Sequence, residues 1–257
     1  MRHRRAFPAA PVQEPPVPDI DLSANRIVDI SQQITHGMWD YKPLDVPTPS
    51  VEVTPIATIA DNGYNLHKFL LNGLTGTYIE SARHMNPDAP YLDKFHPRTL
   101  IRPAKILRLP PAEPYRLYTV EDLEKANPGI EEGDAMIMVT GWDSERDNLP
   151  DYITKGPAFS YSTLEWFMKQ PFSIWATDIT VANCLWAEEQ GLKDEVGKDL
   201  LKDMYDRKPD MRILAPLCNV AGLKGDVGTL IALGINIPDV CAVPARVLFV
   251  EGAVLRT

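Results

Sequence analysis

Residues 74–84 read Leu-Thr-Gly-Thr-Tyr-Ile-Glu-Ser-Ala-Arg-His, and this stretch decides the fold. A Gly-Thr pair is followed by Tyr78, Glu80 and His84 within a turn-rich segment. Glu80 and His84 are possible metal ligands. Leu74, however, offers no lone pair, and a neutral tyrosine is a poor ligand beside imidazole. The stretch alone therefore supplies two metal-binding side chains, fewer than the three or more of a catalytic cation site.

The stretch resembles the signature H-x-G-T-H-x-D-x-P-x-H of the cyclase family that includes the bacterial kynurenine formamidases and isatin hydrolases. The Gly76-Thr77 pair and His84 are retained. Leu74 and Tyr78 replace the first two His of the signature, and Glu80 replaces its Asp. The resemblance implies the fold of this family, while its chemistry cannot simply be copied.

Five further segments follow the order of the family's motifs. They are Asp29-Ile-Ser31 with Gly37-Met38 and Tyr41, then Gly133-Asp134 with Thr140-Gly-Trp142, Gly156-Pro157 with Ser160, Ala176-Thr-Asp178 with Ala182-Asn183, and Leu214-Ala-Pro-Leu-Cys-Asn219. Each alone is common, whereas six segments in register are not expected by chance. The resemblance covers residues 26–257. It implies one α/β domain, a swivelling β/β/α fold with a mixed sheet, and a homodimer or higher homo-oligomer.

The resemblance also implies a degenerate metal site. Family members bind a divalent cation through two His and an Asp, with a further Glu at the position of Ala215 and a His on the preceding helix. No His follows His96 in this chain. One carboxylate and one imidazole cannot supply the three or more ligands of a catalytic cation. We therefore expect no metal and no cofactor; the alternative is Zn or Mn held by Glu80, His84 and a carboxylate from residues 199–203.

His84 occupies the family's proton-shuttling position, a role that suits imidazole near neutral pH. Glu80 would orient His84 or act as a second acid/base group, and the Tyr78 phenol would bind a substrate carbonyl. These three residues form the predicted catalytic group. The alternative is structural: Glu80 pairs with Arg83 or Arg102, and His84 bonds only to the backbone.

Five residues are predicted to bind substrate from their places in the motifs: His36, Trp39, Tyr41, Trp142 and Asn219. Trp39 and Trp142 fall where the resemblance places the border of the active site. Aromatic side chains suit a planar or apolar small molecule, although the commoner fate of a tryptophan is a buried core.

Three functions follow as hypotheses. The first is a metal-independent acid/base enzyme that cyclises, dehydrates or isomerises a small carbonyl compound, for example in secondary metabolism. The second is a metal-dependent hydrolase of an amide, lactam or lactone. The third is a non-catalytic binding descendant, because a fold does not fix a function.

Composition limits the partners and the compartment. A formal charge of −9 over 257 residues argues against nucleic acid and anionic membranes as partners. No apolar run approaches the ~20 residues of a spanning helix, and the basic N-terminus lacks the apolar segment of a secretory signal. Three scattered cysteines, Cys184, Cys218 and Cys241, indicate reduced thiols. We expect a cytoplasmic protein.

Residues 1–25 contain five prolines and few large apolar groups, which predicts an extended arm outside the domain. The arm would either lie on another surface, such as a sister subunit, or be a solvated tail.

Apolar periodicity and turn residues predict the remaining elements. The predicted strands are 27–30, 51–58, 66–71, 100–107, 135–140, 172–176, 211–214, 229–237 and 246–250, and the predicted helices are 119–126, 162–168 and 193–205. Pro103 favours an edge strand or a bulge. Ser162-Thr-Leu-Glu165 has the spacing of a capping box.

Overall fold

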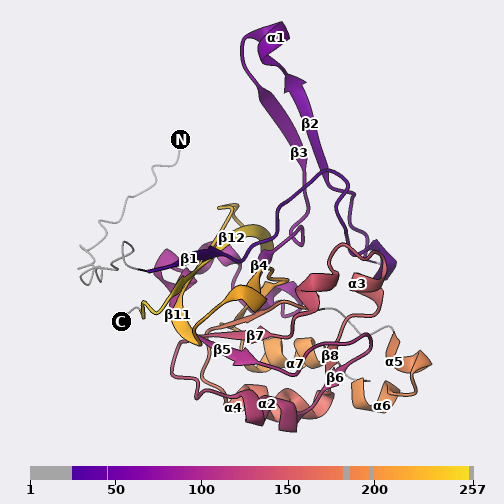
Figure 1. Ribbon diagram of the computed structural model, residues 1–257, viewed down its shortest axis with the longest axis vertical. Coiled ribbons are helices and arrows are strands. Elements are labelled where there is room, and N and C mark those ends of the chain that lie inside the picture. Colours follow the sequence, from indigo (N-terminus) through magenta and orange to yellow (C-terminus); the bar gives the residue numbers. More distant parts are fainter. Residues whose placement is uncertain (1–24, 45, 182–185, 197–198, 255–257) are drawn as a thin grey trace, which may run out of the picture.

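A computed structural model describes residues 25–44, 46–181, 186–196 and 199–254 (Figure 1). The predicted arm, apart from Asn25, lies outside the described residues, as do Cys184 and the Ala182-Asn183 pair. The boundary between arm and domain stays a prediction. Within the described ranges, no helix has the length and apolarity needed to cross a bilayer.

The elements can be listed in chain order. The strands are β1 (Ile27–Asp29), β2 (Glu52–Ala57), β3 (Leu66–Leu70), β4 (Tyr78–Ser81), β5 (Ile101–Arg108), β6 (Leu117–Tyr118), β7 (Ala135–Val139), β8 (Ala158–Phe159), β9 (Ile174–Thr177), β10 (Arg212–Ala215), β11 (Val227–Gly234) and β12 (Ala242–Glu251). The helices are α1 (Ile59–Asn62), α2 (Val120–Ala126), α3 (Asp151–Thr154), α4 (Leu164–Lys169), α5 (Trp186–Glu189), α6 (Lys193–Val196) and α7 (Leu200–Arg207).

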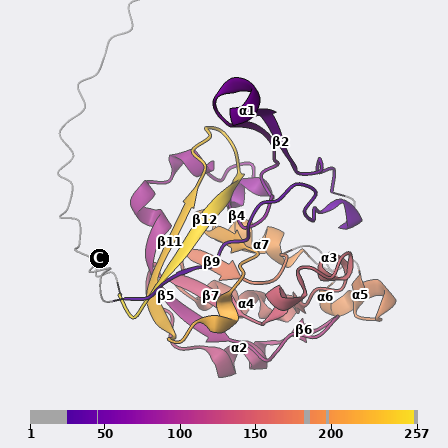
Figure 2. The same cartoon turned by 45° about the horizontal axis from the view of Figure 1, so that its top comes forward.

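One mixed sheet organises the domain. Its strand order is β1-β12-β11-β5-β7-β9-β10-β4. The last strand of this order, β4, also pairs with β12, so that every one of these strands except β1 belongs to a closed, barrel-like sheet. The pairs among β5, β7, β9 and β10 are parallel, and the remaining pairs are antiparallel. Figure 2 shows β11 and β12 running side by side. The predicted α/β domain with a mixed sheet is confirmed.

Side-chain alternation along the strands divides the core in two. On the fully buried strand β7, Met136 and Met138 join one apolar cluster, while Ala135, Ile137 and Val139 join the other. Successive side chains of a strand point to opposite faces, so a continuously apolar run fills a core on each side. The first cluster also contains the apolar residues of α4 and α7, and it is the cluster that borders the site described below.

The predicted helix over 119–126 is confirmed. Thr119 caps α2, and its hydroxyl and the Asp122 carboxylate bond reciprocally to each other's backbone N–H groups. This reciprocal pair satisfies two donors that the first turn of a helix leaves unpaired. The predicted strands are also confirmed, with boundary shifts of a few residues at their ends.

Three local predictions are wrong. Strand β5 is interior rather than an edge; Pro103 is tolerated because β7 pairs with β5 only from Ala104 onward. Ser162 does not cap α4: the hydroxyl of Ser160 accepts from the Ser162 N–H, and a 3-10 turn precedes the helix. Residues 193–205 are not one helix, because α7 starts anew after Asp199, whose side chain accepts the N–H of Lys202.

The β2–β3 pair forms a separate two-stranded sheet that projects from the body of the domain (Figure 1). Its strands are joined through α1, a single helical turn that ends at Gly63 with φ of 78°. Every residue of β3 is exposed. Large apolar side chains are among the exposed ones, including Ile59 at 65%, Phe69 at 62% and Tyr64 at 56% exposure. We call residues 52–70 the hairpin.

Candidate active site

A cavity of about 510 Å³ opens between β4, β8–β9 and the start of α7. Nineteen described residues line it, and fifteen of them are apolar or aromatic. Tyr78, Glu80 and His84 all belong to this lining, so the structure brings the three predicted catalytic residues together. The size and lining are those of a pocket for a small molecule.

Strand β4 positions two of these groups. The sequence 74–84 is not turn-rich throughout, since Tyr78–Ser81 is a buried strand paired with both β10 and β12. Alternation turns Tyr78 and Glu80 to one face and Ile79 to the opposite core. The 3-10 turn Ala82–His84 then carries His84 back toward Glu80, with 3.5 Å between His84 Nδ1 and Glu80 Oε2.

Glu80 is a buried carboxyl group, 3% exposed. The Tyr205 hydroxyl donates to Glu80 Oε1 across 2.5 Å, and Tyr205 comes from α7, 125 residues away in the chain. Burial raises the pKa of Glu80 to about 8, although the hydrogen bond from Tyr205 acts in the opposite direction. Burial therefore favours the protonated form of Glu80 at neutral pH.

His84 has the opposite shift. Its side chain is 33% exposed, and burial lowers the pKa of the imidazole while the charge of Asp199 partly offsets this. The separation of Glu80 and His84 would permit an ion pair, but burial favours the neutral form of both groups. Cys241 Sγ lies 3.8 Å from the same nitrogen, His84 Nδ1. A neutral imidazole thus lies beside a protonated carboxyl group.

Two phenols stand next to this pair. The hydroxyls of Tyr41 and Tyr78 lie 3.2 Å apart, and both residues line the cavity. Burial raises the pKa of Tyr78 well above its ordinary value, and the neighbouring Tyr41 and Glu80 add to the shift. Both phenols remain neutral hydrogen-bond donors throughout the physiological pH range.

The structural alternative for Glu80 needs an arginine partner, and both candidates bond elsewhere. Arg83 donates to the hydroxyl of Tyr91 across 3.3 Å and places its guanidinium over the ring of Tyr91. Arg102 donates from Nε to the carbonyl oxygen of Gly133 across 2.5 Å. The described contacts of Glu80 are with Tyr205 and His84 instead.

Of the five residues predicted to bind substrate, one lines the cavity and four do not. Tyr41 lines the cavity, whereas Trp39 is buried behind it and meets the Tyr41 ring edge-on at 5.4 Å. Trp142 lies in the same core but not in the lining, since its indole N–H donates to the carbonyl oxygen of Tyr152 across 3.1 Å. Trp39 and Trp142 are therefore core residues outside the cavity lining. The structure does not support their predicted contact with substrate.

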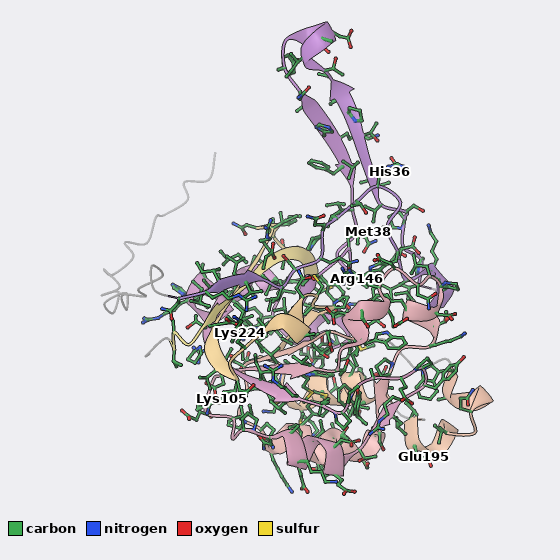
Figure 3. All side chains as sticks on the ribbon, in the orientation of Figure 1. His36, Met38, Lys105, Arg146, Glu195 and Lys224 are labelled. Atoms are coloured by element: carbon green, nitrogen blue, oxygen red, sulfur yellow. The ribbon has the colours of Figure 1, made fainter. Side chains whose placement is uncertain are left out.

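His36 and Asn219 lie away from the cavity lining. His36 is exposed at the base of the hairpin, where its Nδ1 accepts the N–H of Val53 across 3.3 Å (Figure 3). Asn219 is exposed with φ of 60°, and its side chain donates to the carbonyl oxygen of Asp29. A backbone role explains Asn219, because asparagine tolerates the left-handed conformation.

Residues that sequence reasoning missed complete the site. Tyr205 comes from α7, Phe159 from β8 and Trp175 from β9. Asp199, which caps the start of α7, was expected only as an alternative metal ligand. The charged helical pattern indicated that α7 exists, but no local signal indicated which of its residues would face β4. Only the tertiary packing of α7 against the turn after β4 brings Tyr205 to Glu80.

The family's cation-binding positions hold mostly side chains without suitable donor atoms. Leu74 and Tyr78 occupy two ligand positions, and Ala215 pairs directly with Tyr78 across β10 and β4. Among the described residues, no three His, Cys, Asp or Glu side chains form a group that could hold a metal ion. Asp199 lines the cavity with Glu80 and His84 but does not complete such a group. The donor set of the described residues does not fit a catalytic cation.

Comparison with known proteins agrees with the fold. The family model Cyclase, described as "Putative cyclase", matches residues 28–182. None of the curated proteins matches the chain. Among solved structures, isatin hydrolase A from Labrenzia aggregata bound to benzyl benzoate superposes with a TM-score of 0.73 at 18% identity, covering 91% of this chain and 95% of that one.

Two further structures are similar. An isatin hydrolase bound to the product analogue thioisatinate gives a TM-score of 0.71 at 18% identity, covering 89% of this chain and 93% of that one. A potential metal-dependent hydrolase with cyclase activity gives a TM-score of 0.65 at 17% identity, covering 89% of this chain and 98% of that one. At these identities the likeness shows the fold alone. The chain belongs to the Cyclase family, as the matched residues show.

Proposed function

We propose that this protein is an enzyme that acts on a small carbonyl compound by acid/base catalysis, with Glu80 as the acid and His84 as the base. The observation that carries the proposal is the pair itself: a buried carboxyl group and an imidazole, 3.5 Å apart, in the lining of one cavity. An acid/base pair requires surroundings that keep one group protonated and its neighbour unprotonated at the same pH.

The proposed division of labour follows from the two protonation states. The neutral imidazole of His84 takes a proton from the substrate, either from a carbon next to a carbonyl or from an attacking hydroxyl. Protonated Glu80 gives a proton to the carbonyl oxygen, on which charge develops. The phenol of Tyr78 donates a hydrogen bond toward the same oxygen, the role of an oxyanion-binding group. After the step, Glu80 is ionised and His84 protonated, and proton exchange with solvent or product restores the pair.

Cyclisation, dehydration and isomerisation suit this arrangement best, because each needs only a proton removed at one atom and a proton supplied at another. Metal independence is part of the proposal and is supported by the donor set, in which Leu74, Tyr78 and Ala215 replace imidazole and carboxylate ligands.

Hydrolysis is the second candidate. It is supported by the similar solved structures, two of which are described as isatin hydrolases and one as a potential metal-dependent hydrolase. In this version the neutral imidazole of His84 would take the proton of an attacking water, and Glu80 would protonate the leaving group. The same two residues would therefore carry either reaction.

The test is a substrate screen over lactones, amides and carbonyl compounds in metal-free buffer, followed by His84→Ala. We expect turnover to fall by ~10²–10⁴-fold, the typical contribution of a general acid or base. The matched control is His67→Ala, because His67 is exposed on β3 of the hairpin. An active His84→Ala protein with the wild-type rate would refute the assignment, and activity that requires an added cation would refute metal independence.

A further inference from the structure

The polar side chains in the described lining of the cavity come from Tyr41, Tyr78, Glu80, His84, Thr180 and Asp199. No lysine or arginine occurs among the described residues that line the cavity. The described part of the lining therefore offers hydrogen-bond donors but no lysine or arginine.

Among the described residues, the arginine next to His84 in the chain is bound away from the cavity. Arg83 adjoins His84 in the chain, but its guanidinium lies over the Tyr91 ring, 4.4 Å from the centroid, and donates to the carbonyl oxygen of Ala89 as well. An arginine held by these contacts is not free to meet a ligand in the cavity.

One group of the lining is an anion. Asp199 lies in the lining, and it is fixed there because its side chain caps α7 by accepting the N–H of Lys202 across 3.0 Å. A carboxylate or phosphate on a substrate would lose water on entry and would meet Asp199, with no lysine or arginine among the described lining residues to compensate its charge. Burying an unpaired charge is costly, and a like charge nearby adds to that cost.

Resting on the proposed function, we infer that the substrate is an uncharged, largely apolar carbonyl compound, and that Asp199 is a specificity-determining residue that discriminates against anionic molecules. The body of such a compound would contact the aliphatic and aromatic lining, which includes Leu74, Phe159, Trp175 and Ile179. Its carbonyl oxygen would accept from the neutral donors on β4.

The experiment compares two ligands of nearly the same shape: 4-benzoylbenzamide, which is uncharged, and 4-benzoylbenzoate, which carries a carboxylate. Their dissociation constants are measured by titration calorimetry at neutral pH with the full-length wild-type protein. We expect the amide to bind at least tenfold more tightly than the carboxylate.

Two variants locate the cause. Asp199→Asn removes the charge but keeps a side chain that caps a helix equally well, so we expect the preference for the amide to shrink several-fold. Asp206→Asn makes the same change on an exposed residue of α7 outside the cavity and should leave the preference unchanged. Equal or tighter binding of the carboxylate to the wild type, a preference that Asp199→Asn does not alter, or failure of both ligands to bind would overturn the inference.

This outcome is separable from that of the proposed function, because binding at equilibrium needs no turnover. Preferential binding of the amide to a protein that catalyses nothing would sink the proposed activity and leave the inference standing. An anionic substrate whose turnover depends on His84 would do the reverse.

Discussion

Strand β4 and the hairpin depart from the usual distribution of side chains in opposite directions: β4 buries polar groups, and the hairpin exposes apolar ones. Strand β4 holds a carboxyl group and a phenol in the interior, with Glu80 and Tyr78 both 3% exposed. The hairpin holds Ile59, Tyr64 and Phe69 in solvent. Lone exposed apolar residues are ordinary, but a buried ionisable group without a charged partner is rare.

The difference shows that the burial of Glu80, and not the exposure of the hairpin, lowers the stability of the fold. Glu80 is desolvated, held by the Tyr205 hydroxyl and raised in pKa to about 8, so the fold keeps it at the expense of stability. Such costs concentrate at functional sites. The hairpin belongs to a separate two-stranded sheet, and an isolated hairpin of this kind is marginally stable in water. The comparison predicts that β4 governs activity and pH dependence, whereas the hairpin governs neither.

The largest expected effect is on the rate. Glu80→Gln keeps the size of the side chain but removes the proton that Glu80 supplies, so we expect turnover to fall by ~10²–10⁴-fold, comparable with His84→Ala. Glu52→Gln makes the same change on β2 of the hairpin and should leave the rate unchanged. A loss much smaller than that of His84→Ala would show that Glu80 only orients the imidazole.

The next effect is on stability as a function of pH. In the unfolded chain Glu80 loses its proton near its ordinary pKa of 4.5, whereas in the fold it keeps the proton up to a pKa of about 8. The folded state binds more protons between these values, so the free energy of unfolding should fall as pH rises through this window, by on the order of a few kcal/mol. Denaturant titrations from pH 5 to pH 9 measure the slope. Glu80→Gln should flatten it, and identical pH profiles of the two proteins would contradict the account.

The smallest effect is expected at the hairpin. Phe69 is 62% exposed, so Phe69→Ala should change the free energy of unfolding by about 0.5 kcal/mol or less. Phe249, which is fully buried on β12, makes the matched control, and Phe249→Ala should cost ~3–5 kcal/mol. Chemical denaturation of both variants decides the point. A cost for Phe69→Ala close to that for Phe249→Ala would mean that the hairpin is covered in solution, and light scattering would then test the predicted homo-oligomer, which stays a prediction.

The sequence predicted what depends on local order. The apolar run of β7 and the capping box of α2 are determined by neighbours in the chain, and Tyr78, Glu80 and His84 share one strand and the turn after it. Family motifs in register indicated the fold even though most metal ligands are replaced.

What the sequence could not predict depends on packing between distant segments. Tyr205 reaches Glu80 because α7 packs beside the end of β4, a contact without a local signature. Trp142 stands in a motif segment, yet Gly141 in the left-handed conformation begins a 3-10 turn, and the indole ring then stacks on Tyr152 instead of lining the cavity. Proximity in a motif is therefore weaker information than the direction in which the backbone turns a side chain.

The central claim is that Glu80 is a neutral acid at physiological pH, and infrared difference spectroscopy of wild type against Glu80→Gln tests it most directly. The account predicts a carbonyl stretching band of a protonated carboxyl group that is present at pH 6 and pH 7 in the wild type and disappears with a midpoint near pH 8. The band should be missing from Glu80→Gln at every pH. A difference spectrum that shows only the carboxylate bands of Glu80 already at pH 6 would contradict the account.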